Sequence, residues 1–147
     1  MTYAYQWKRG TTVTSGATGA TYTATASDVG ASLSVTVTGS KTGYTSVTKS
    51  SAAKVIAKGT LTAPTPTVTG TKKVASTLTA VAGTWGPAPV SLSYQWYRSG
   101  TLISGATTGT YKLVTADKGK TITVKVTGTK TGYTTTAKTS AATAAIG

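Results

Sequence analysis

Residues 121–127 read Thr-Ile-Thr-Val-Lys-Val-Thr, with polar and apolar side chains in strict alternation. Such alternation is typical of a β-strand with one buried and one solvated face, because successive side chains point to opposite sides of a sheet. Ile122, Val124 and Val126 are therefore expected to point into a core, while the Thr and Lys side chains face water.

The same alternation occurs 89 residues earlier, at residues 32–38, which read Ser-Leu-Ser-Val-Thr-Val-Thr. At this offset residues 1–58 align with residues 90–147 without a gap, and 26 of the 58 positions are identical. Tyr5-Gln6-Trp7 falls on Tyr94-Gln95-Trp96, for example. A match of this length indicates an internal duplication, in which each copy is one structural unit.

The offset also predicts the domain boundaries. Residues 67–147 are expected to form a complete domain. Residues 1–57 are expected to form a partial domain, because they contain no counterpart of residues 60–89. Residues 58–66 are expected to form a linker, since Pro64 and Pro66 fix their own φ angles and favour extended geometry in the residues before them.

Short strands separated by Gly and Pro turns are expected along the whole chain, and no window shows a helical period. Besides the two alternating segments, the expected strands are residues 66–69, 77–80, 110–113 and 134–139. Short strands at regular spacing predict an all-β protein of the sandwich type.

A tryptophan on a mid-repeat strand, followed by an Asp-x-Gly turn, is typical of immunoglobulin-like sandwiches. The second copy contains a further set of matching residues, namely Pro66–Gly70, Gly83–Trp85, Tyr94–Trp96, Arg98, Ser104–Thr107, Tyr111, Ala116–Lys120, Thr127, Gly128, Gly132 and Tyr133. In these residues it resembles the tandem bacterial immunoglobulin-like repeats found at the C-termini of actinobacterial secreted cell-wall hydrolases and surface proteins. The resemblance implies tandem immunoglobulin-like β-sandwiches, the first with strands C to G only and without its N-terminal strands. It also implies a non-catalytic accessory role.

Each core must be held by packing alone, because the two inter-sheet cysteines of the antibody pattern are absent. The expected core residues are Trp7, Val35 and Val37 in the first copy and Trp96, Val124 and Val126 in the second. Without its opening strands, the first copy is expected to leave a gap lined by unpaired backbone groups, which strands from a neighbouring molecule could fill.

The composition weighs against an enzyme. The chain has no His and no Cys, and Asp28 and Asp117 are its only acidic residues. General acids and bases, thiol nucleophiles and metal ligands are therefore almost missing, and no catalytic residue, metal site, cofactor or disulfide is expected. Both aspartates are instead expected to accept backbone N–H bonds in turns.

The formal net charge of the chain is +13, from fifteen basic and two acidic residues. A field of this sign attracts polyanions, such as anionic cell-wall polymers. The alternative is a role in solubility, since lysines on strands discourage edge-to-edge pairing. Nucleic acid is not expected as a specific partner, because no recognition motif accompanies the charge.

Five residues are candidate contacts for a ligand. Trp85 lies in a Gly/Pro-rich loop, where it either plugs the end of the sandwich or stands exposed as a contact residue. Tyr44 and Tyr133 each follow a lysine, Lys41 and Lys130, in a Lys-Thr-Gly-Tyr turn. These tyrosines either contact a ligand or pack over the end of a hairpin.

Two functions follow from these observations. The first is a spacer and cell-wall or polyanion-binding module of a secreted or cell-surface protein. The second is a structural subunit of a virus particle or extracellular fibre, which assembles with neighbouring copies by strand complementation. Insertion into a membrane is not expected, because no apolar stretch approaches the roughly 20 residues that cross a bilayer.

Overall fold

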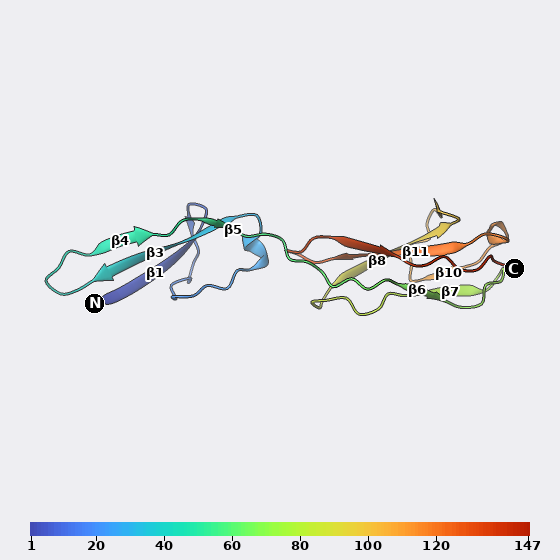
Figure 1. The fold of residues 1–147 in the computed structure, drawn as a ribbon, viewed down its shortest axis with the longest axis horizontal. Helices are drawn as coiled ribbons and strands as arrows, with labels where there is room; N and C mark the ends of the chain where they lie inside the picture. The colour runs from blue at the N-terminus through green and yellow to red at the C-terminus, as the bar shows by residue number, and fades with distance from the viewer. The chain divides into compact units, whose positions relative to one another are not determined.

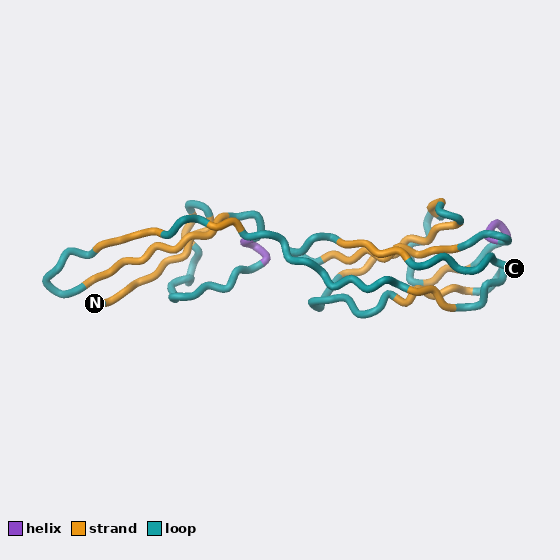
Figure 2. The backbone as a smooth tube through the Cα atoms, in the orientation of Figure 1, coloured by secondary structure: helices purple, strands orange, loops and turns teal.

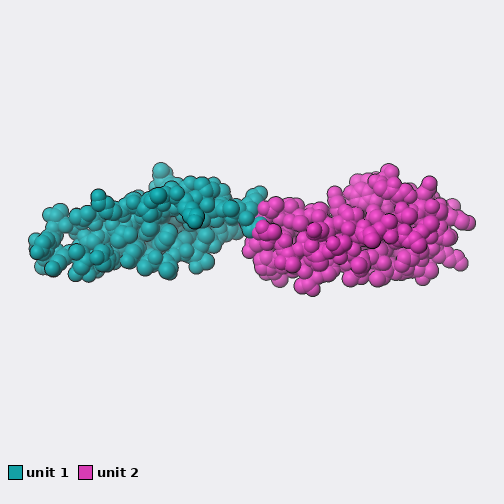
Figure 3. Space-filling model, in the orientation of Figure 1, with its two compact units in different colours: residues 1–59 teal, residues 60–147 magenta.

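The chain folds as an all-β protein with several antiparallel sheets, as the strand pattern predicted. The computed structural model describes residues 1–147 and divides them into two compact units, residues 1–59 and residues 60–147 (Figure 3). Helical structure is confined to two single turns of 3₁₀ helix, Ala26–Asp28 and Thr115–Asp117. No helix is both long enough and apolar enough to span a bilayer.

Unit 1 consists of a single antiparallel sheet (Figure 1). Its strands run in the order β2-β1-β3-β4, and β5 also pairs with β3. The long central strand β3 carries the alternating sequence and pairs with β1 over eight residues, with Trp7 opposite Val35. The strands are β1 (Thr2–Arg9), β2 (Thr12–Val13), β3 (Ser32–Ser40), β4 (Val47–Ser50) and β5 (Lys54–Val55).

Unit 2 consists of two antiparallel sheets, in the orders β10-β7-β6 and β12-β11-β8-β9. The pairing of β11 with β8 places Val124 opposite Trp96. The strands are β6 (Thr67–Thr69), β7 (Thr77–Val81), β8 (Ser91–Arg98), β9 (Thr101–Leu102), β10 (Thr110–Lys112), β11 (Ile122–Thr129) and β12 (Thr136–Thr139).

The main core of unit 2 draws on both of its sheets. Leu78 of β7 packs with Trp96 of β8 and Val124 of β11, and all three side chains are completely buried. A second cluster contains Leu61, Trp85 and Val126. Leu61 belongs to the predicted linker, but it is only 5% exposed because it packs inside unit 2.

The sheet face of unit 1 that matches the core face of unit 2 is more open to solvent than that core face. Trp7, Val35 and Val37, which were expected in a core, all remain partly exposed, and only Leu33 of this face is buried, at 7% exposure. The main reason is that Leu61, Leu78 and Trp85, which help to cover this face in unit 2, come from residues 60–89, and these have no counterpart in unit 1.

The gap in unit 1 was expected to be lined by unpaired backbone groups, but the backbone of β3 is paired. Strand β3 pairs with β1 on one side and with β4 and β5 on the other. Its side chains are partly uncovered, but its peptide groups have ladder partners. The unpaired segment lies elsewhere: residues 21–23, which match β10, form no strand and are drawn as loop in Figure 2.

Candidate functional site

In unit 1 the acidic residue is buried inside the molecule. The side chain of Asp28 has no exposed area, and its Oδ1 accepts a 2.7 Å hydrogen bond from Nε of Arg9. Its Oδ2 accepts bonds from the Thr25 backbone N–H and the Tyr22 hydroxyl, at 2.7 and 2.9 Å. These bonds, led by the one from the Thr25 backbone, lower the pKa of Asp28 from 3.8 to about 2.

Unit 2 contains the same arrangement at the matched positions. Oδ1 of Asp117 accepts a 2.5 Å bond from Nε of Arg98, and its Oδ2 accepts bonds from the Tyr111 hydroxyl and the Val114 N–H. Burial, followed by the contact with Asp117, raises the pKa of Tyr111. Each tyrosine also stacks on a tryptophan, with ring centroids 5.6 Å apart for Trp7 and Tyr22 and 5.8 Å apart for Trp96 and Tyr111.

These two clusters determine the charge of the surface. The chain has two acidic side chains, and each is buried in an ion pair with one of the two arginines. The remaining basic residues are all lysines, none of which is buried or in an ion pair. The side-chain charge that water or a ligand meets is therefore almost entirely that of lysine ammonium groups.

In the Lys-Thr-Gly-Tyr turn of each unit, the lysine lies over the tyrosine ring. Nζ of Lys41 lies 5.3 Å from the ring centroid of Tyr44, and Nζ of Lys130 lies 5.7 Å from that of Tyr133, both within cation–π distance. The surroundings differ, because Nζ of Lys130 also donates to the Pro89 carbonyl. Tyr44 is 72% exposed, whereas Tyr133 packs against the second cluster of unit 2.

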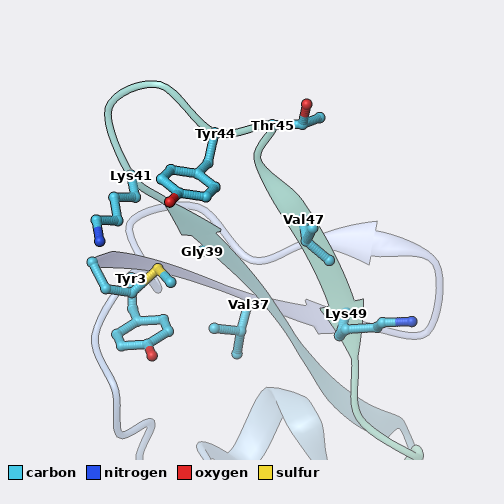
Figure 4. A pocket seen from close by; sticks show the side chains of 9 residues that line it. Tyr3, Val37, Gly39, Lys41, Tyr44, Thr45, Val47 and Lys49 are labelled. Carbon is cyan, nitrogen blue, oxygen red and sulfur yellow. The ribbon is translucent and has the colours of Figure 1, made fainter.

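The exposed Lys41–Tyr44 pair borders a hollow in unit 1 with a volume of about 560 Å³ (Figure 4). The residues around it come from β1 and the residue before it, from β3, from β4 and from the loop between β3 and β4, as Figure 4 shows. The apolar part of its lining includes Met1, Tyr3, Val37 and Val47. The hollow thus combines an apolar floor with ammonium groups at its border.

Trp85 is a packing residue. It is 7% exposed, its indole N–H donates to the Ala82 carbonyl at 3.1 Å, and it packs with Leu61 and Val126. Of the two positions left open for this residue, the structure places it in the plug at the end of unit 2. The Lys-Tyr pairs thus remain as the candidate contacts.

No group of three His, Cys, Asp or Glu side chains is close enough to hold a metal ion. The two carboxylates lie one in each unit, and both are occupied by internal hydrogen bonds. What the surface can offer a ligand is positive charge, tyrosine rings and the apolar hollow.

The sequence interpretation missed the pairing of the arginines with the aspartates. It placed both aspartates in turns, and it treated the arginines as part of the general positive charge. A signal was available, because Arg9 and Asp28 are 19 residues apart and Arg98 and Asp117 have the same separation. The lining residues Met1, Tyr3 and Val47 carry no such signal, since local sequence does not show which strand face lacks a cover.

Comparisons with protein-family models, with curated proteins and with solved structures produced no match to this chain.

Proposed function

We propose that the chain is a non-catalytic pair of immunoglobulin-like repeats that serves as a spacer and binds anionic polymers, as part of a secreted or cell-surface protein. The observation that carries the proposal is the lysine surface. Because both carboxylates are buried in ion pairs with arginine, no acidic side chain opposes the lysines at the surface. Polyanions gain counterion-release free energy on such a surface.

The exposed Lys41–Tyr44 pair supports the same function. An ammonium group beside a tyrosine ring offers a charge for an anionic group and an apolar face for a sugar or polymer backbone. The resemblance to cell-wall repeats makes an anionic wall polymer the expected class of ligand. Strand pairing within each unit provides a firm support for these contacts.

The test is binding of the whole chain to purified cell walls, with and without their anionic polymers. We expect binding to depend on the polymers. We also expect the affinity to fall by at least about tenfold between roughly 50 and 200 mM salt, because ion release drives the association. Equal binding to stripped walls, or an affinity that salt does not change, would refute the proposal.

A variant with Lys41→Gln and Tyr44→Ala tests whether the Lys-Tyr pair contributes. Both residues are exposed, so the fold of unit 1 should be retained. Its matched control is Lys54→Gln together with Val55→Ala, which are also exposed and lie on β5. We expect a larger loss of wall binding in the first variant than in the control.

A second candidate function is that of a structural subunit of a virus particle or extracellular fibre. The observation that favours it is the partly exposed face formed by Trp7, Val35 and Val37, whose matched residues in unit 2 are completely buried. An uncovered apolar sheet face favours association with another polypeptide. Sedimentation of the chain at micromolar concentration, alone and mixed with the other proteins of the particle or fibre, tests it. A strict monomer in both samples would contradict it.

A further inference from the structure

The uncovered face of unit 1 has a filled counterpart in unit 2. There, three side chains from residues 60–86 cover the matched face: Leu61, Leu78 and Trp85, which are 5%, 0% and 7% exposed. Leu78 packs in the cluster that contains Trp96, and the other two pack on Val126. Unit 1 has its own residues for the floor of this site, but it has no counterpart of these three covering side chains.

The glycine on which Trp85 rests in unit 2 has a counterpart that lines the hollow of unit 1. A Cβ added at Gly128 would lie 2.5 Å from Cε3 of Trp85, so the indole rests directly on this glycine. At the matched Gly39, the nearest atoms to such a Cβ are those of Met1 and Tyr3, at 3.7 Å. Gly39 lines the hollow, and the space that an indole fills in unit 2 is therefore open in unit 1.

A backbone edge is available beside the same face. In unit 2, residues 110–112 pair with residues 77–79 of β7, and the Leu113 N–H donates to the Ser76 carbonyl at 2.9 Å. In unit 1 the matched residues 21–23 belong to no ladder, and the N–H of Ala24, which matches Leu113, has no backbone acceptor. A strand could add here by main-chain hydrogen bonds.

We propose that this face of unit 1 binds a polypeptide segment from outside residues 1–147 that has the chemistry of residues 60–86. Such a segment would add a strand beside residues 21–23, place an aliphatic side chain over Trp7 and lay an indole on Gly39. The inference rests on the second candidate function and is independent of polyanion binding.

The occupant is not an intact second copy of residues 1–147. These residues contain one such segment, and that segment already covers the matched face of unit 2. If two copies exchanged this segment, every face that closed in unit 1 would leave another open in unit 2. Exchange between copies therefore gains no burial, whereas a separate donor does.

The experiment uses the full chain and a synthetic peptide with the sequence of residues 60–86. We expect saturable binding of one peptide per chain, with new hydrogen-exchange protection at residues 21–24 and a shift of the NMR signal of the Trp7 indole N–H. Peptides with Leu78→Ala or Trp85→Ala should bind at least about tenfold more weakly, because they lose a buried anchor.

Gly39→Ala provides the control within the chain. Its new methyl group has ordinary contact distances in the free chain, so the fold should be retained, but it would block the indole. We expect the affinity for the peptide to fall at least about tenfold, since a clash with a central anchor is not tolerated. Thr38→Ala, on the opposite face of β3, should leave the affinity unchanged.

Two results would overturn the inference. One is the absence of saturable binding, or binding that Gly39→Ala does not weaken. The other is a dimer of the chain that forms through the face of unit 1 and that the peptide cannot dissociate. That dimer would make a second copy the occupant, and it would leave both the assembly function and the polyanion function standing.

Discussion

Trp7 and Trp96 are matched residues in different surroundings. Each indole N–H donates to a backbone carbonyl twelve residues further along the chain, and each ring stacks on a tyrosine. Trp96 is nevertheless completely buried, while Trp7 remains partly exposed. The difference follows from Leu78, which packs in the cluster with Trp96 and has no counterpart in unit 1.

Replacement of each tryptophan by alanine should therefore have unequal effects. We expect Trp96→Ala to lower the free energy of unfolding of unit 2 by roughly 3–5 kcal/mol, as a core truncation. For Trp7→Ala we expect a smaller loss in unit 1, about 1–2 kcal/mol, because less buried area is removed. Urea unfolding followed by residue-resolved NMR signals measures both, and equal losses would show that the two faces are equally covered.

The buried carboxylate of Asp28 gives unit 1 a defined pH response. The folded-state pKa of about 2 lies below the ordinary value of 3.8, so the carboxylate stabilises the fold at pH values above 3.8. This contribution is lost as the pH falls from 3.8 towards 2. In that range the unfolded chain, with its higher carboxyl pKa, binds a proton more readily than the folded protein does.

An NMR titration of the Thr25 amide, which donates to Asp28, measures this pKa directly. We expect a midpoint near 2. In Arg9→Gln the pKa of Asp28 should rise but stay below 3.8, because the bond from the Thr25 backbone is the largest cause of the shift and is retained. A midpoint at the ordinary value of 3.8 would contradict the buried geometry.

At the scale of elements, strand formation depends on the partner strand as well as on the sequence. Residues 21–23 and 110–112 read Thr-Tyr-Thr and Thr-Tyr-Lys, which are similar in β propensity. Only the second forms a strand, β10, because β7 lies beside it. The matched segment of unit 1 has no such neighbour.

Hydrogen exchange of the free chain should show this contrast. We expect the Leu113 amide to exchange slowly, since it donates to Ser76, and the matched Ala24 amide to exchange at close to the rate of an unstructured peptide. The amides of β3 that take part in its ladders should be protected, because this strand is paired on both sides. Equal protection of Ala24 and Leu113 would indicate a backbone partner for residues 21–24 that the fold does not contain.

At the scale of the whole molecule, the two units differ in how completely their cores are covered. Unit 2 buries a contiguous cluster between two sheets, while unit 1 has one sheet with a partly exposed face. Because buried apolar area is the main source of stability, unit 1 should be the weaker of the two.

We therefore expect unfolding of the full chain in two steps, with unit 1 first. NMR signals of β3 should disappear at a lower urea concentration than those of β11. Trp7→Ala should shift only the first step and Trp96→Ala only the second. A single cooperative transition for all signals would mean that the units are coupled in stability.

Local sequence was sufficient to predict several features of this protein. The period-two alternation in residues 32–38 and 121–127 predicted β3 and β11, because a strand exposes alternate residues to opposite faces. The shortage of acidic residues predicted a positive surface. The Lys-Thr-Gly-Tyr turns identified their lysines and tyrosines as candidate ligand contacts, which stays a prediction, whereas the contact of each lysine with its tyrosine is a finding of the structure.

The tertiary structure decided which of these residues are covered. Trp85, Leu61 and Gly39 have ordinary local sequences, and their roles depend on segments that are distant in the chain. Identical periodicity in β3 and β11 led to the same prediction of burial for Val37 and Val126, yet only Val126 is completely buried. Periodicity determines the direction in which a side chain points, whereas burial requires a second layer, and in unit 1 that layer is missing because residues 60–89 pack only in unit 2.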